Sequence, residues 1–119
     1  MYFASDNSGP AHPEVLAALA SANTGYAMPY GADTIMDEVR ETLRSIFEAP
    51  EASVYLVATG TAANALALAT MCAPYETVFC SPTAHIHEDE CNAPEFYTAG
   101  AKLSIVGTLD QMSPETLRS

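Results

Sequence analysis

The stretch SVYLVATGTAANALALA, residues 53–69, decides the fold of this chain. It starts as an apolar run rich in β-branched and aromatic residues, breaks at Gly60, and continues with small residues that suit a helix. This pattern predicts a strand, a tight turn and a helix. The first backbone N–H groups of such a helix have no partner within the helix, and the positive end of the helix dipole faces the turn. The turn therefore favours an anion.

The groups in this turn suit a phosphate. Gly60 lets a phosphate approach the backbone, and the hydroxyls of Thr59 and Thr61 offer additional hydrogen bonds. The glycine spacing of the dinucleotide-binding fold is absent, and so is the Gly-Lys-Ser/Thr ending of the nucleoside-triphosphate loop. A phosphate site and a plain buried corner between a strand and a helix both remain open on these residues alone.

Helical and strand patterns alternate on both sides of this stretch. Apolar residues at helical spacing predict helices over 12–22 and 34–48, the second of them capped by Asp33. Short apolar runs predict strands at 77–80 and 103–107, separated by a loop or short helix. Strands that alternate with helices predict an α/β fold, with a mainly parallel sheet covered by helices on both faces.

Composition excludes several classes of partner. The net charge is −11, from 15 acidic and 4 basic side chains, so nucleic acid and anionic membrane surfaces are poor partners. No apolar run is long enough to span a bilayer, and the first residues lack a signal-peptide pattern, so we expect a cytoplasmic protein. The three cysteines lack paired metal-site spacing, which indicates reduced, mostly buried thiols.

A histidine-bearing segment, residues 81–91, directly follows the strand predicted at 77–80. Ligands of open α/β sheets bind beyond the carboxyl ends of the strands, so this segment and the Gly60 turn should share one edge. One interpretation is a zinc or iron site. Its candidate ligands are His85, His87, Asp89, Glu90 and Cys91. In a second interpretation one histidine lies against an aromatic ligand ring or transfers a proton. The third is a solvated polar loop.

Four motifs, in the same order and at consistent spacing, resemble the low-specificity L-threonine aldolases of the β-eliminating lyase group. They are Ser5-Asp6-Asn7, Tyr30-Gly31-Ala32-Asp33, Thr59-Gly60-Thr61-Ala62-Ala63-Asn64, and Ala84-His85 followed by Glu90. The resemblance implies the aspartate-aminotransferase type of fold and pyridoxal 5'-phosphate as cofactor. It also implies cleavage of the Cα–Cβ bond of a β-hydroxy amino acid, which converts threonine into glycine and acetaldehyde.

The resemblance also implies roles for individual residues. Gly60 and Thr61 match the turn that binds the cofactor phosphate. His85 matches the histidine that stacks on the pyridine ring and that is a candidate base toward the substrate β-hydroxyl. Ser5 matches a serine near the substrate carboxylate. Tyr30 matches a tyrosine at the edge of a neighbouring subunit's active site, which implies a homodimer or homotetramer with shared sites. No metal is implied.

The chain departs from the family pattern at informative places. Members often have glutamine where this chain has Ala62. The family places the cofactor-binding lysine, the aspartate that pairs with the pyridine nitrogen and the carboxylate-binding arginines downstream of this region, and Lys102 lacks the surroundings of that lysine. A predicted helix start at Ser113-Pro114-Glu115, close to the last residue, also leads us to expect a fragment of a longer protein. We therefore expect residues 1–119 to be the first part of a cofactor-binding large domain, inactive by itself.

Other function classes stay open. A metal-dependent hydrolase or lyase would use His85, His87 and Cys91 or Asp89. Another pyridoxal-phosphate enzyme of the same fold type would share the phosphate turn and differ in residues that this chain lacks. A non-catalytic acidic interaction domain would bind neither a metal nor a phosphate.

Overall fold

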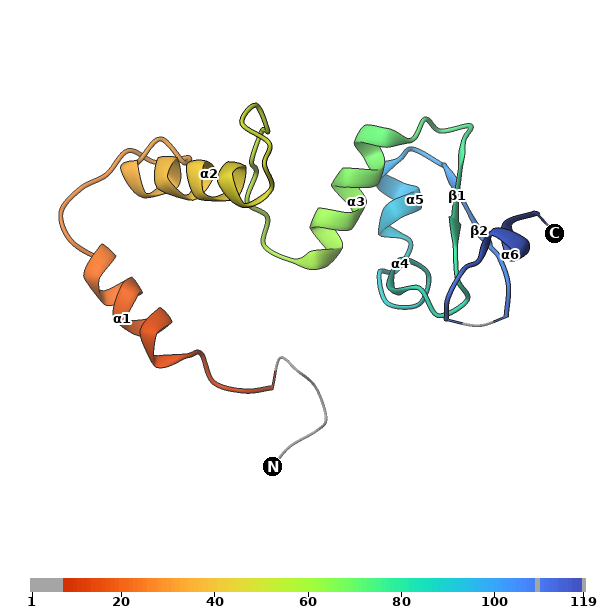
Figure 1. Cartoon of the computed structure of the whole chain (residues 1–119), viewed down its shortest axis with the longest axis horizontal. Helices are drawn as coiled ribbons and strands as arrows, with labels where there is room; N and C mark the ends of the chain where they lie inside the picture. Colours follow the sequence, from red (N-terminus) through yellow and green to blue (C-terminus); the bar gives the residue numbers. More distant parts are fainter. Residues whose placement is uncertain (1–7, 109, 119) are drawn as a thin grey trace. The chain divides into compact units, whose positions relative to one another are not determined.

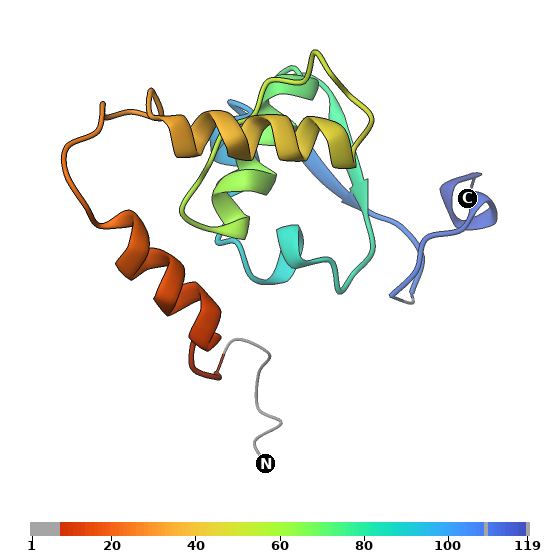
Figure 2. The same cartoon turned by 60° about the vertical axis from the view of Figure 1, so that its left-hand side comes forward.

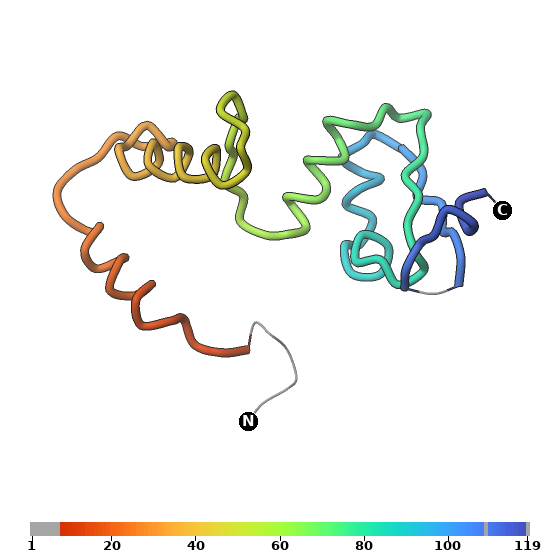
Figure 3. Tube along the Cα trace, in the orientation of Figure 1, coloured from red at the N-terminus to blue at the C-terminus, as the bar shows by residue number. Residues whose placement is uncertain are grey.

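The computed structural model describes residues 8–108 and 110–118 (Figure 1). The chain divides into two compact units, Met1–Val54 and Tyr55–Ser119, a division that the sequence patterns did not indicate. We call them the N-terminal unit and the C-terminal unit. The trace in Figure 3 follows the chain through each of them in turn.

The N-terminal unit contains two helices, α1 (Pro13–Ala22) and α2 (Thr34–Ile46). Both were predicted, and their starts follow the expected signals. Pro13 occupies the first turn of α1, where its missing N–H costs no hydrogen bond. Oδ1 of Asp33 accepts a hydrogen bond from the backbone N–H of Met36 at 2.9 Å, which caps α2.

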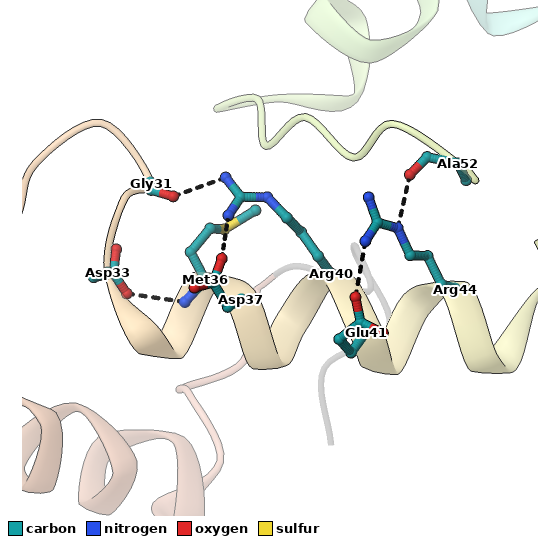
Figure 4. A network of polar contacts seen from close by, with 8 residues as sticks. All are labelled: Gly31, Asp33, Met36, Asp37, Arg40, Glu41, Arg44 and Ala52. Atoms are coloured by element: carbon teal, nitrogen blue, oxygen red, sulfur yellow. Dashed lines mark hydrogen bonds and ion pairs between the residues drawn. The ribbon is translucent and has the colours of Figure 1, made fainter. Parts of the chain in front are cut away.

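Two arginines tie α2 to the segments on either side of it (Figure 4). The guanidinium of Arg40 donates to Oδ1 of Asp37 at 2.8 Å and to the backbone carbonyl of Gly31 at 2.7 Å. Arg44 repeats the arrangement one turn later, with Oε1 of Glu41 at 2.8 Å and the carbonyl of residue 52 at 3.0 Å. The acidic partners are exposed, so these ion pairs form the solvated structural face that the sequence predicts.

The C-terminal unit contains the sheet and most of the buried side chains. Its elements in chain order are α3 (Gly60–Met71), β1 (Thr77–Cys80), α4 (His85–Glu88), α5 (Ala93–Tyr97), β2 (Lys102–Ile105) and α6 (Pro114–Arg118). Strands β1 and β2 pair in parallel, with Val78 opposite Leu103. The parallel pairing and both strand positions were predicted, β2 starting and ending earlier than the sequence suggested.

Small side chains form the core of this unit. Helices α3 and α5 pack against each other and lie side by side in Figure 1; Figure 2 shows the same elements turned by 60°. Ala65 of α3 is completely buried, as is Pro94 of α5, and Cys80 at the end of β1 is 3% exposed. Alanine in the middle of α3 lets the two helix backbones approach closely, which explains the alanine-rich sequence of this helix.

One expectation about the sheet is wrong. The apolar run from residue 53 up to Gly60 was expected to form a strand, but within the described parts of the chain it pairs with neither β1 nor β2, and Tyr55 is 83% exposed. A β-type sequence becomes a strand only where a neighbour satisfies its backbone groups. Within the C-terminal unit, Cys80 on one face of the sheet is buried, while Phe79 on the other face is 53% exposed.

Candidate functional site

The predicted phosphate turn lies at the start of α3. Thr59 caps the helix, since its Oγ1 accepts a hydrogen bond from the N–H of Ala62 at 3.1 Å and its carbonyl accepts one from Ala63 at 3.1 Å. The N–H groups of Gly60 and Thr61 have no acceptor among the residues that the structure describes. A Cβ added at Gly60 would meet nothing within 4 Å, so the backbone is open to a ligand here.

The predicted histidine, His85, opens the short helix α4 after β1. Its Nδ1 lies 2.9 Å from Oε1 of Glu90, and its own side chain is 63% exposed while that of Glu90 is completely buried. The same oxygen of Glu90 accepts a hydrogen bond from Nδ2 of Asn64 at 2.7 Å. More than half of the His85 side chain is thus available to a ligand, while its Nδ1 edge is held by a buried carboxylate.

Asn64 joins the two predicted parts of the site. It lies on α3, four residues after Gly60, so one helical turn separates it from the start of the phosphate turn. Through Glu90 it connects α3 to the histidine segment, 26 residues further along the chain. Asn64 ends the motif at residues 59–64, in which the sequence predicts roles for Gly60 and Thr61 and none for Asn64. Its spacing of one turn from Gly60 is the signal that points to it.

The candidate metal ligands are not brought together. Nε2 of His87 lies 3.4 Å from Oε1 of Glu88, its neighbour in α4, and not beside a second candidate ligand. Cys91 is exposed. Across residues 8–108 and 110–118, no three side chains of His, Cys, Asp or Glu are grouped so that they hold a metal ion. The described residues therefore give the zinc or iron interpretation no geometric support.

Neither of the two predicted substrate contacts belongs to the C-terminal unit. Ser5 lies outside the residues that the structure describes. Tyr30 belongs to the N-terminal unit and is fully exposed, with a φ of 62°. Gly31 follows with a φ of 73°, and Arg40 holds its carbonyl, so the exposed ring stands on a turn of fixed backbone geometry.

The cysteines are less uniformly buried than expected. Cys80 is buried, Cys72 is half-buried and Cys91 is exposed. Burial raises the pKa of the Cys80 thiol, and the nearby carboxylate of Glu95 raises it further. A thiol with a raised pKa stays protonated at neutral pH and is a poor nucleophile, so Cys80 is part of the core and not of the chemistry.

The sequence of this chain is similar to those of proteins from one known family. The model of the β-eliminating lyase family matches residues 2–119. The low specificity L-threonine aldolase of Pseudomonas aeruginosa is 43% identical over 117 residues, which are 98% of this chain and 34% of that protein. The enzyme of the same name from another Pseudomonas strain is 45% identical over 101 residues, 85% of this chain and 29% of that protein. The chain spans about a third of the length of these relatives.

A solved structure shows the same fold. The threonine aldolase of Leishmania major matches 93% of this chain and 32% of its own, with a TM-score of 0.83 and 24% sequence identity. At that identity the match shows the fold and not the function.

No helix among the described residues is both long and apolar enough to cross a membrane.

Proposed function

Since the chain belongs to the β-eliminating lyase family, we propose that it supplies the phosphate turn and the reactive histidine of a pyridoxal-phosphate-dependent lyase. The enzyme cleaves the Cα–Cβ bond of β-hydroxy amino acids, and threonine yields glycine and acetaldehyde. Two relatives named low specificity L-threonine aldolase, each more than 40% identical, support this choice of reaction. The observation that carries it is the Asn64–Glu90 link between the turn and His85.

The residues of the turn fit the cofactor phosphate. Gly60 and Thr61 offer two backbone N–H groups without acceptors in the described structure, and the space beside the Gly60 Cα is open. The dipole of α3, a helix of 12 residues, adds positive potential at the same place. Gly60 and Thr61 therefore bind the phosphate, with the hydroxyl of Thr61 as an additional donor.

His85 fits the rest of the cofactor and the reacting hydroxyl. Its exposed imidazole stacks on the pyridine ring, while its Nδ1 edge stays bonded to Glu90. An ionised carboxylate only accepts hydrogen bonds, so Nδ1 carries the proton and Nε2 keeps a free lone pair. Nε2 takes the proton of the substrate β-hydroxyl as the aldehyde leaves. Bound pyridoxal phosphate supplies the electron sink for the pair released at Cα.

The other parts of the site come from outside residues 1–119 and from Tyr30 and Ser5. We assign the cofactor-binding lysine, the pyridinium-binding aspartate and the carboxylate-binding arginines to the remainder of a complete protein, of which this chain is the first part of the large domain. Ser5 contacts the substrate. Tyr30, exposed on its turn, reaches the active site of a neighbouring subunit in a cytoplasmic homodimer or homotetramer.

Replacing His85 tests the proposed chemistry. In the complete protein, His85→Ala removes the base, and we expect turnover of threonine to fall by about 10²–10⁴-fold, the usual contribution of a positioned base. His87→Ala is the matched control, because His87 pairs with Glu88 within the same short helix and should leave turnover unchanged. Equal turnover in the wild type and His85→Ala would remove His85 from the mechanism.

Replacing Gly60 tests the phosphate turn separately. Gly60→Val places a branched side chain in the open space where the phosphate binds, and that side chain meets no protein atom within 4 Å of its Cβ. We expect a higher Kd for pyridoxal 5'-phosphate, measured by fluorescence titration of the apoprotein, with little change in Tm. An unchanged Kd would show that the phosphate binds elsewhere.

A further inference from the structure

Glu90 is a buried carboxylate that has no arginine or lysine partner among the described residues. Its side chain is completely buried, and His85 is the basic group with which it pairs. Burying an ionised carboxylate is unfavourable unless hydrogen bonds and an opposite charge compensate it. Here the compensation is incomplete, because Oε2 of Glu90 is buried without any hydrogen-bond partner in the described structure. Stability alone gives no reason to keep a carboxylate at this place.

The contacts of Glu90 define the state of His85. Oε1 accepts a hydrogen bond from Nδ2 of Asn64 at 2.7 Å and lies 2.9 Å from Nδ1 of His85, within hydrogen-bond distance. Because the carboxylate has no proton to donate, the neutral imidazole must be the Nδ1–H tautomer. Nε2, which has no partner among the described residues, then presents a lone pair and no proton.

We propose that Glu90 is the positioning residue that fixes the tautomer and the ring orientation of His85, and that Asn64 holds Glu90 in place. The inference rests on the proposed function, since it explains how His85 is kept ready to accept the β-hydroxyl proton. A buried carboxylate that orients a catalytic histidine is a recurrent solution, as in hydrolases where an aspartate holds the base in the productive tautomer.

The backbone around Glu90 supports this role. Cys91 and Asn92, which follow it directly, have φ values of 49° and 62°, a left-handed conformation that costs free energy for residues other than glycine. The N–H of Ala93 donates to the carbonyl of Glu90 at 2.9 Å and closes this turn before α5. The chain thus adopts an unfavourable turn at the point that directs the carboxylate inward toward His85.

Asn64 extends the positioning to the phosphate turn. Its amide is held on α3, the same rigid helix whose first residues bind the phosphate in the proposed function. A helix fixes the separation between Gly60 and Asn64, so the Asn64–Glu90–His85 chain of hydrogen bonds sets the imidazole relative to the phosphate. Removing Asn64 should therefore loosen His85 less than removing the Glu90 carboxylate does.

Glu90→Gln in the complete protein tests the proposal. The substitution keeps size and shape, but its amide can donate to Nδ1 and so permits the unproductive Nε2–H tautomer. We expect kcat to fall by about 10–100-fold, the effect typical of losing a partner that orients a histidine ligand. KM should change little, and Tm should not fall, because an uncompensated buried charge is removed. Asn64→Ala should lower kcat by a smaller factor.

A readout independent of activity is the histidine spectrum of the apoprotein. Long-range ¹H–¹⁵N spectra of ¹⁵N-histidine-labelled protein distinguish the two tautomers, and His85→Asn identifies the signals of His85. We expect the Nδ1–H pattern in the wild type and its loss in Glu90→Gln. Glu95→Gln is the matched control, because Glu95 also has a buried Oε2 without a partner but no contact with His85. It should leave the spectrum unchanged.

The outcomes separate this inference from the proposed function. An Nε2–H pattern in the wild type, or an unchanged His85 signal in Glu90→Gln, would overturn the positioning role. A fall in Tm that accounts for the whole loss of kcat would overturn it as well, because Glu90 would then be structural. Absence of aldol cleavage in the wild type, with the Nδ1–H pattern present and lost in Glu90→Gln, would reject the proposed function and leave the positioning of His85 intact.

Discussion

The two units of this chain are stabilised in different ways. In the described part of the N-terminal unit, Met36 is the only buried residue, and the helices α1 and α2 are held by caps and exposed ion pairs. The C-terminal unit buries residues from α3 and α5, Cys80 at the end of β1, and Ala101 just before β2. It also buries three polar residues, Ser81, Glu90 and Thr98. The phosphate turn and His85 both belong to this second unit.

This difference shows what long-range packing adds to local structure. Capping and ion pairing act within three or four residues, so they define a helix but do not bring distant residues together. A site needs side chains from separate elements at fixed distances. In the C-terminal unit the contact between α3 and α5 supplies that rigidity, and it allows Asn64 and Glu90 to meet.

The largest expected effect comes from overpacking the core of the C-terminal unit. Ala65 is completely buried in α3. Ala65→Leu inserts a branched side chain there, and we expect the free energy of unfolding to fall by about 1–3 kcal/mol. Ala18→Leu on the exposed surface of α1 is the matched control and should change it by less than about 0.5 kcal/mol. Urea denaturation measures both; similar losses would contradict the contrast between the units.

The free energy of unfolding should depend on pH through the Cys80 thiol, which belongs to the C-terminal unit. The pKa of Cys80 is raised above its ordinary value of 9.0 by burial and by Glu95. The folded state then holds the thiol proton more tightly than the unfolded state does, so this contribution is present below pH 9 and is lost as the pH rises further. The loss is at most about 1.4 kcal/mol per pH unit for one proton.

Comparing cysteine variants isolates that contribution. Cys80→Ala should remove the corresponding slope in a plot of unfolding free energy against pH between about 9 and 11. Cys91→Ala, at an exposed position in the same unit, should keep the slope of the wild type. Identical slopes for all three proteins would show that Cys80 has no part in the alkaline destabilisation.

Removing a helix cap should have a smaller, local effect in the N-terminal unit. Asp33→Ala deletes the acceptor for the N–H of Met36, and a lost cap costs about 1 kcal/mol. We expect faster hydrogen exchange in α2 with no change in β1 and β2. Thr59→Ala removes the equivalent cap of α3 and should also speed exchange in α5, which packs on α3. If Asp33→Ala also made exchange faster in elements outside α2, as Thr59→Ala does in α5, the stability of α2 would not depend on local interactions alone.

The smallest expected effect belongs to the exposed ion pairs of α2. Asp37→Asn and Glu41→Gln should each cost about 0.3–0.5 kcal/mol at low salt. The cost should disappear near 1 M salt, where the Debye length falls to about 3 Å. Circular dichroism melts at two salt concentrations measure this. A loss that persists at high salt would mean that the pairs contribute more than a solvated helix face.

The sequence predicts the local elements well because their signals are local. The Asp33 cap, the helical spacing of α2 and the apolar run of β1 each act over a few residues, and the structure confirms all three. The run from residue 53 up to Gly60 has an equally good β pattern, but it lacks a paired neighbour within the described residues. Strand formation depends on a distant partner, which propensity does not report.

The candidate site also has features that the local sequence predicts and features that depend on distant residues. The backbone donors at Gly60 and Thr61 could be predicted from the sequence, because the free N–H groups of a helix start are set by local geometry. The Asn64–Glu90 hydrogen bond could not be read, since it joins residues 26 positions apart. Nor does composition separate His85 from His87. In the structure, the completely buried Glu90 beside His85 distinguishes it from His87, whose partner Glu88 is exposed.

The most direct test of the account is a titration of the apoprotein with pyridoxal 5'-phosphate, followed through ¹⁵N-labelled glycine, threonine and histidine. We predict that the amide signals of Gly60 and Thr61 and the ring signals of His85 shift together, while Thr24 and Gly25 beyond α1 do not. Pyridoxal without the phosphate should leave Gly60 and Thr61 unshifted. Binding of pyridoxal phosphate with no change at Gly60 and Thr61 would contradict the claim that the C-terminal unit holds the cofactor phosphate.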